Sequence, residues 1–399
     1  MYRGHHIQKL MSSSSWIRRM FEEGIELKKE IGAENVFDFS LGNPITEPPK
    51  AFFDKLKYIA NNPEVGKHRY MPNTGFVSTR EKVAKYYSKE FGLNISKDEV
   101  IMTVGAAGAI NVILKTFIDP KNEVIVFAPY FVEYRFYVDN HYGRLVVLDS
   151  KDDFTPDLEA LENNINAETS VIIINSPNNP TGKVYSDQFY KDLVDIVKKG
   201  SERIGRPIYI ISDEPYRKII YDDIKNPILF KHYKYSIFIT SHSKDLALAG
   251  ERIGYAIIHP DMPWKKELME GMSFSNRILG YVNAPAMMQL LIEDILDETV
   301  DVNSYKEKRD ILYNGLIESG YEVNKPDGSF YFFVKNPIKD DIKMINHLKK
   351  YNILVVPGIG FGKKGYFRLS YATTTDIVKR SIPKFKEAMD ELKNKNYLI

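Results

Sequence analysis

A lysine stands at the end of a short apolar run, in surroundings that suit chemistry on a carbonyl compound. Lys244 comes shortly after the run Ile237–Thr240. Two hydroxyl side chains, Ser241 and Ser243, lie just before it, and Arg252 follows eight positions later. Burial lowers the pKa of a lysine and exposes the lone pair that attacks a carbonyl carbon. The hydroxyls and the arginine would suit a phosphate held beside it, although a single lysine is far more often a surface charge.

Other polar or small-residue segments also follow apolar runs. Asp213 follows Ile208–Ile211, and the loop Asn175–Gly182 follows Val171–Ile174. Open α/β folds build their sites at such strand ends. Taken alone, the aspartate would more often cap a helix, and the loop could be an ordinary turn.

A run of small residues, Thr103–Ala109, precedes an apolar helical pattern. Small residues let the backbone N–H groups of Gly105, Ala106 and Ala107 approach an anion closely at the start of a helix. The same run could also serve helix packing alone.

The elements that would position these residues alternate along the chain. Between about Ala51 and Ile258, helical patterns separate short apolar runs, which is typical of a mostly parallel sheet covered on both faces. The runs are Val124–Phe127, Leu145–Leu148, Val171–Ile174, Ile208–Ile211, Ile237–Thr240 and Tyr255–Ile258.

The flanking segments have a different pattern. Ile17–Ile31 predicts an amphipathic helix, and one long helix is expected from beyond Pro285 to about Ser319. After it, three short strands are expected among helices, which indicates a smaller α+β domain. These strands are Ser329–Val334, Ile353–Val356 and Tyr366–Tyr371.

The motifs together resemble the class I/II aminotransferases, which belong to fold type I of the pyridoxal-phosphate (PLP) enzymes. Ser241-His242-Ser243-Lys244 and Gly250-Glu251-Arg252-Ile253-Gly254 resemble the family's active-site lysine segment, and the other motifs occur in the family's order. The resemblance implies an α/β fold with a large PLP-binding domain at 49–299. It also implies a smaller α+β domain, formed by an N-terminal segment at 1–48 and a C-terminal part at 300–399.

The resemblance also implies a role for each motif residue. Lys244 would hold pyridoxal 5'-phosphate as a Schiff base and then move the substrate's Cα proton. The cofactor phosphate would be bound by Gly105, Ala106, Ala107, Ser241, Ser243, Arg252 and, from a neighbouring subunit, Tyr70. The cofactor ring would be held by Phe131, Asn179, Asp213 and Tyr216, and the substrate carboxylate by Gly42, Asn179 and Arg368. The family often has a side-chain donor where Ala106 or Ala107 stands, so only backbone contacts would remain there.

The implied reaction transfers an amino group between an L-amino acid and a 2-oxo acid, and aspartate with 2-oxoglutarate is the preferred pair. A dicarboxylate needs a second cation, for which Arg277 is a candidate, although a surface arginine is the commoner case. Alanine or aromatic transamination and a β C–S lyase reaction remain alternatives. A non-catalytic PLP-binding regulator is a further one, but residues 1–40 are too few for a DNA-binding module.

Composition limits the remaining possibilities. The 399 residues are 43% hydrophobic and 27% charged, carry a formal net charge of +2 and include no cysteine. Disulfides and thiolate chemistry are therefore excluded, and we expect no metal site. We expect neither a nucleic-acid nor a membrane partner. The protein is expected to be a cytoplasmic homodimer. Disorder is expected only in the polar segment Met1–Ser15, which lacks the apolar core of a secretory signal.

Overall fold

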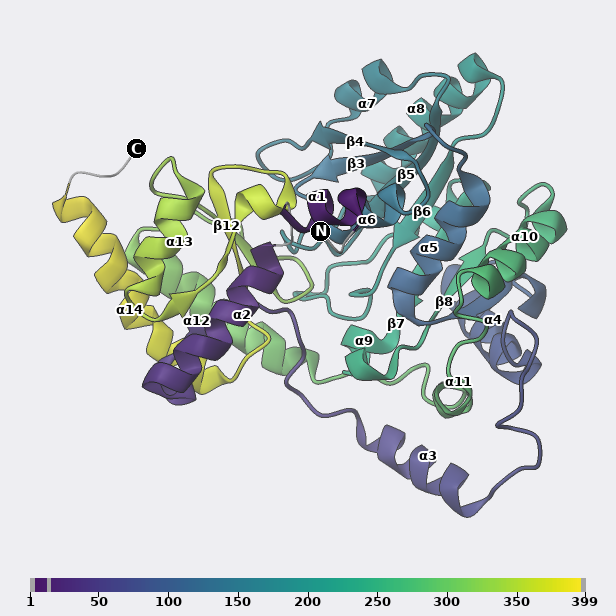
Figure 1. The fold of residues 1–399 in the computed structure, drawn as a ribbon, viewed down its shortest axis with the longest axis horizontal. Helices are drawn as coiled ribbons and strands as arrows, with labels where there is room; N and C mark the ends of the chain where they lie inside the picture. Colours follow the sequence, from purple (N-terminus) through teal and green to yellow (C-terminus); the bar gives the residue numbers. More distant parts are fainter. Residues whose placement is uncertain (1–3, 13–15, 396–399) are drawn as a thin grey trace.

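The computed structural model describes residues 4–12 and 16–395. Its centre is a seven-stranded sheet of order β2-β8-β7-β6-β5-β3-β4, in which β8 runs antiparallel to β2 and β7 and the other pairs are parallel (Figure 1). The strands are β2 Val100–Thr103, β3 Glu123–Ala128, β4 Arg144–Asp149, β5 Thr169–Asn175, β6 Tyr209–Asp213, β7 Ser236–Ser241 and β8 Gly254–Ile258. The predicted α/β class with a mostly parallel sheet is confirmed. Strand β2 was not predicted.

Helices cover both faces of this sheet. Along β3, Val124 and Val126 join the core beneath α5 Gly105–Phe117, α6 Glu133–Asp139 and α10 Lys265–Ile278. Ile125 and Phe127 point the other way, into the core beneath α7 Leu158–Asn164 and α8 Asp187–Ile204. This double coverage explains why the strands are apolar at nearly every position. A third cluster joins β2 and β8 to α3 Lys50–Asn61, α4 Val77–Phe91 and α11 Ala286–Ile292.

A separate core lies on the opposite side of the molecule, at the left of Figure 1. It is built from α2 Trp16–Ile31, β1 Phe37–Asp38, α12 Val302–Ser319, β9 Tyr331–Lys335, α13 Asp341–Lys349, β10 Ile353–Leu354, β11 Val356–Pro357, β12 Tyr366–Ser370 and α14 Thr375–Asn394. β1 pairs with β10, and β11-β12-β9 form an antiparallel sheet. Helix α2 matches the predicted amphipathic helix. The domain boundaries at 48/49 and 299/300 stay a prediction.

The single long helix expected to run to Ser319 is wrong. The chain leaves helix α11 after Ile292, and α12 begins only after Asp301, whose carboxylate accepts from the backbone N–H of Ser304. Tertiary contacts cause the break: Lys218 donates to the backbone carbonyls of Leu296 and Glu298. A backbone carbonyl that accepts a hydrogen bond from the Lys218 side chain does not accept the backbone N–H bond that would continue an α-helix.

The amino-terminal expectation is wrong in part. Helix α1 covers His5–Ser12, where the sequence predicted disorder, and residues 1–3 and 13–15 lie outside the described part of the chain. Among the described residues no helix combines the length and apolarity that crossing a bilayer requires. A cytoplasmic location stays a prediction.

Candidate active site

A cavity of about 330 Å³ lies where β5, β6 and β7 end, and its walls come from both sides of the molecule. Twelve residues named from the sequence line it: Gly42, Ala106, Ala107, Phe131, Asn179, Asp213, Tyr216, Ser241, Ser243, Lys244, Arg252 and Arg368. The strand-final residues Asn175, Asp213 and Ser241 are all in this wall. The sheet therefore gathers side chains that are far apart in the sequence at one edge.

Three of the named residues lie elsewhere. Gly105 does not line the cavity; its φ of +78° suits glycine, and an added Cβ would lie 2.9 Å from Arg252 Nη2. Tyr70 is 92% exposed, and it does not line the cavity of its own chain. Arg277 is also exposed and lines a different cavity of about 850 Å³ beside α10.

Lys244 lies partly buried in the wall of the cavity. It belongs to the short helix α9 His242–Asp245 that follows β7, and its Nζ donates to the carbonyl oxygen of Gly42 at 2.7 Å. Burial, reinforced by the positive charges of Arg368 and Arg252, lowers the pKa of Lys244 to about 8. Its amine is therefore neutral far more readily near physiological pH than a surface lysine, as a nucleophile or a proton carrier requires.

Asp213, the last residue of β6, offers one free carboxylate oxygen. Its Oδ2 accepts a hydrogen bond from the hydroxyl of Tyr134, whereas its buried Oδ1 has no partner in the described structure. Burial raises the pKa of Asp213 to about 7; the charge of Glu214 adds to the increase and the Tyr134 hydrogen bond opposes it. A buried carboxylate with an unused oxygen is poised to accept a hydrogen bond from a cationic ring N–H.

Arg368, in β12, is a buried guanidinium with spare hydrogen-bonding capacity. It is 2% exposed, donates to Ser40 O at 2.6 Å and Asn179 Oδ1 at 3.2 Å, and has an unpartnered Nε. Burial lowers its pKa, and the two hydrogen bonds that it donates go to neutral oxygens. Its planar fork can therefore take a carboxylate ligand in two-point fashion.

Tyr331, in β9, is a cavity residue that the sequence did not reveal. Its hydroxyl lies 2.9 Å from that of Tyr216, and the Arg368 guanidinium lies 4.7 Å from its ring centre. A Cβ on Gly42 would lie 1.9 Å from the Tyr331 hydroxyl oxygen, so only glycine allows this approach. Tyr331 stands in the predicted strand Ser329–Val334, where an inward tyrosine looks like any core aromatic.

Replacing Tyr331 with Phe should lower kcat/KM for the amino-group transfer two- to tenfold. One neutral hydrogen bond to Tyr216 is lost, which corresponds to about 0.5–1.5 kcal/mol, while the ring beneath Arg368 remains. Steady-state kinetics would measure the change. Tyr313→Phe, in α12 outside the cavity, controls for loss of a hydroxyl, and an unchanged Tyr331→Phe enzyme would show that this bond has no role in the reaction.

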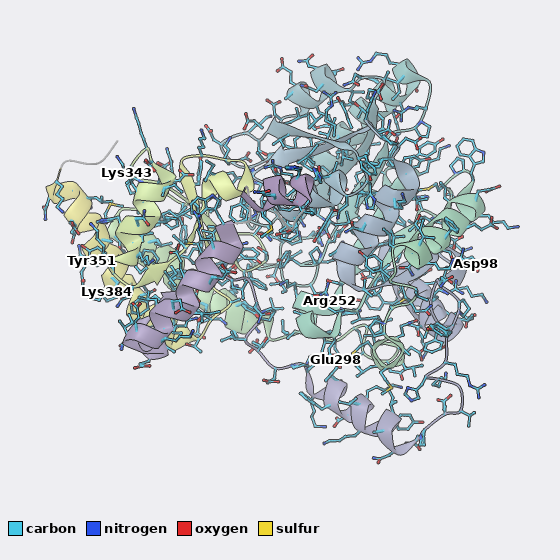
Figure 2. All side chains as sticks on the ribbon, viewed as in Figure 1. Asp98, Arg252, Glu298, Lys343, Tyr351 and Lys384 are labelled. Carbon is cyan, nitrogen blue, oxygen red and sulfur yellow. The ribbon has the colours of Figure 1, made fainter. Side chains whose placement is uncertain are left out.

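Arg252 lies beside the start of α5. It donates to Ala249 O at 3.0 Å and Val104 O at 3.2 Å, and Figure 2 labels it in the central region of the molecule. The hydroxyl-bearing Ser241 and Ser243 line the same cavity as the small residues Ala106 and Ala107. A guanidinium, two hydroxyls and the N-terminus of a thirteen-residue helix form a site suited to a phosphate group.

Comparisons with known proteins agree on the family. The family model "Aminotransferase class I and II" matches residues 34–382. A protein of Methanocaldococcus jannaschii named probable aspartate aminotransferase is 31% identical, over 90% of this chain and 95% of its own. The aspartate aminotransferase of Thermotoga maritima is 30% identical, over 90% and 91%. A crystal structure of an amino transferase from Eubacterium rectale superposes with a TM-score of 0.94 at 40% identity, covering 100% of this chain and 99% of that one.

Fold and site define an α/β enzyme in which a partly buried lysine, a buried carboxylate and a buried arginine converge on one cavity. Because the family model covers most of its length, the chain belongs to the class I and II aminotransferases. Its activity is the transfer of amino groups between amino acids and 2-oxo acids, and aminotransferases of this class and fold depend on pyridoxal phosphate.

Proposed function

We propose that this chain binds pyridoxal 5'-phosphate in the cavity around Lys244 and transfers the amino group of aspartate to 2-oxoglutarate. The observation that carries the proposal is the pairing of a partly buried lysine, whose pKa is lowered to about 8, with a buried carboxylate that has a free oxygen. The residues fit the cofactor: Asp213 Oδ1 lacks a donor that a ring N–H would supply. The Arg252 region supplies donors for a phosphate.

Each residue of the cavity has a task in the proposed reaction. Bound there, the cofactor would carry the amino group and take up the electron density released when the substrate's Cα–H bond breaks. Lys244 moves the Cα proton, as a base when its amine is neutral and as an acid once it is protonated. Asp213 keeps the ring nitrogen protonated, and Arg368 orients the substrate through its α-carboxylate.

The remaining residues hold the ring. Phe131 lines the cavity and would stack on the ring, which would contribute roughly 1 kcal/mol beyond burial. Tyr216 and Asn179 would donate to its phenolic oxygen. Asn179 accepts from Arg368 through Oδ1, which leaves its amide N–H groups for this purpose. The same contact links the substrate's carboxylate site to the cofactor site. Ser241, Ser243, Arg252 and the backbone of Gly105, Ala106 and Ala107 would hold the phosphate.

A half-reaction experiment tests both the cofactor and the substrate. Purified protein is loaded with pyridoxal phosphate and mixed in turn with aspartate, asparagine, alanine and phenylalanine, and the visible absorbance of the lysine-bound cofactor is followed. Aspartate should discharge the absorbance fastest. Asparagine is the matched control, because it has nearly the same shape without the side-chain charge. Equal rates for aspartate and asparagine would refute the dicarboxylate assignment while leaving transamination intact.

The aspartate proposal requires a further cation. The cations that line the described cavity are Lys244, Arg252 and Arg368, and each already has a task. We propose that the chain works as a homodimer in which a second copy completes the site. Tyr70, 92% exposed, would reach the phosphate of that copy. Arg277 remains a prediction as the source of the missing charge.

Mixing two inactive variants tests the shared site. The two variants, Lys244→Ala and Tyr70→Ala, are unfolded and refolded together so that hybrid dimers form. In each hybrid, one cavity combines Lys244 of the Tyr70→Ala chain with Tyr70 of the Lys244→Ala chain. If Tyr70 acts across the dimer, activity should rise well above the sum of the two separate variants. If Tyr70 acts within its own chain, every cavity stays defective and no gain appears. Size measurement by sedimentation confirms that hybrids have formed.

A further inference from the structure

The hydroxyl of Tyr134 is the hydrogen-bond donor to the Asp213 side chain. Tyr134 lies in the first turn of α6 and is 1% exposed, and Asp213 is 5% exposed at the end of β6. An ionised carboxylate can only accept, so the tyrosine hydroxyl must donate to Oδ2. The contact therefore joins a helix on one face of the sheet to the strand end that lines the cavity.

Because of this contact, the two carboxylate oxygens of Asp213 have different hydrogen-bonding states. Oδ2 is occupied by Tyr134, and Oδ1 is buried without a partner in the described chain. The main chain is fixed as well, because Asn175 donates to the backbone oxygen of Asp213 at 2.8 Å. With the backbone and one oxygen held, rotation of the carboxylate would break a bond to a buried hydroxyl, which is costly. Oδ1 is therefore held in a fixed direction and is free to accept a hydrogen bond from a ligand.

Among the groups that influence the pKa of Asp213, Tyr134 is the one that lowers it. Glu214, the next residue along the chain, acts on the Asp213 carboxylate through space, and the charge of Asp213 in turn raises the pKa of Tyr137, from the same helix as Tyr134, and of Tyr216. Burial and Glu214 raise the pKa of Asp213, and the Tyr134 hydrogen bond is the influence that lowers it. Loss of the hydroxyl would therefore make the carboxylate bind its own proton more tightly.

We propose that Tyr134 is a positioning residue for the reaction: it holds Asp213 Oδ2 and thereby directs Oδ1 at the pyridine nitrogen of the cofactor as an ionised acceptor. The inference rests on the proposed function, since it concerns the proton shared between the ring and Asp213. Tyr134 touches neither substrate nor cofactor in this arrangement. Its contribution is to keep that proton on the ring nitrogen and not on the carboxylate.

The nitrogen resonance of the cofactor reports the position of this proton directly. Protein loaded with pyridoxal phosphate carrying ¹⁵N in the ring should give the shift of a protonated ring nitrogen. In Tyr134→Phe the shift should move toward that of neutral pyridine, because Asp213 has become the stronger base. We also expect the dissociation constant for pyridoxal phosphate to rise about tenfold, measured by absorbance titration. A purely structural tyrosine would alter stability without moving the nitrogen resonance.

Two further variants keep the test decisive. Tyr130→Phe removes a buried hydroxyl from the same segment, one that does not line the cavity, and should leave the nitrogen shift unchanged. Placing 3,5-difluorotyrosine at position 134 keeps the hydroxyl and strengthens it as a donor, so the shift should move further toward the protonated form even if Tyr134→Phe folds poorly. Binding with unchanged shifts in both position-134 variants would overturn this inference alone. Failure of the unaltered chain to bind pyridoxal phosphate would overturn the proposed function and this inference together.

Discussion

Replacing Lys244 with Ala should abolish amino-group transfer, with a loss of turnover on the order of 10⁴-fold or more. Two contributions disappear together: the covalent attachment of the cofactor and the transfer of the Cα proton, of which acid–base catalysis alone accounts for roughly 10²–10⁴-fold. The variant should also lose the site at which borohydride fixes a pyridoxyl group. Steady-state rates, and mass mapping of the peptide that carries Lys244, measure the two effects separately.

The structural consequence of removing the Lys244 side chain needs its own control. Lys244 donates to the Gly42 carbonyl, and its loss leaves that carbonyl without this donor. Lys308 is a matched case: it is 2% exposed, its pKa is lowered by burial, and its Nζ donates to Thr373 O at 3.0 Å, outside the cavity. Lys308→Ala should lower the melting temperature and retain transfer. Normal turnover in Lys244→Ala, or borohydride labelling at another lysine, would end the assignment of this residue.

Most of the site was predictable because its residues follow buried strands. Asn179, Asp213 and Lys244 each come within a few residues of an apolar run that does form a strand of the sheet. Parallel strands bring such ends to one edge, so knowing the strands is nearly enough to know which side chains meet. Arg368 differs, because its strand belongs to the other core; only the resemblance placed it at the same cavity.

The supporting aromatic residues were not predictable from their pattern. Tyr134 and Tyr331 look like core side chains and are indeed buried. Their function lies in where one hydroxyl points: at Asp213 in one case and at Tyr216 in the other. That direction depends on how α6 and β9 pack against the sheet, which no local periodicity encodes. The sequence around Tyr134 and around Tyr331 is equally consistent with side chains that only pack in the hydrophobic core.

Tertiary contacts also override local preference in the segment between α11 and α12. The residues after Ile292 have helical spacing, yet the Lys218 ammonium binds two of their carbonyls. Asp245 O accepts from Val300 N at 2.7 Å, which ties the same segment to the lysine-bearing helix α9. The break therefore lies against the active-site strand end, so the prediction failed where the chain bends to support the site.

Arg368→Lys should reduce kcat/KM for the amino acid by roughly 10- to 150-fold, because a hydrogen bond to a charged group contributes about 1.5–3 kcal/mol. Lysine keeps the charge and loses the planar fork. It cannot donate at once to Ser40 O, Asn179 Oδ1 and a substrate carboxylate, as the guanidinium is placed to do. We expect most of the loss in KM, because the carboxylate is bound both before and during the chemical step. Cofactor binding and borohydride labelling of Lys244 should be retained.

The choice of substrate separates this role from a structural one. An amine that has no α-carboxylate offers Arg368 nothing to bind, so its slow reaction should proceed at the same rate in Arg368→Lys and in the unaltered chain. Arg309→Lys provides the structural control: Arg309 is also fully buried on the same side of the molecule and pairs with Asp222 and Asp310, away from the cavity. It should destabilise the fold without changing KM for the amino acid. The carboxylate-free amine makes no contact with Arg368 that the substitution could remove. If Arg368→Lys slowed this amine as much as the amino acid, the arginine would be shaping the cavity and not binding the substrate carboxylate.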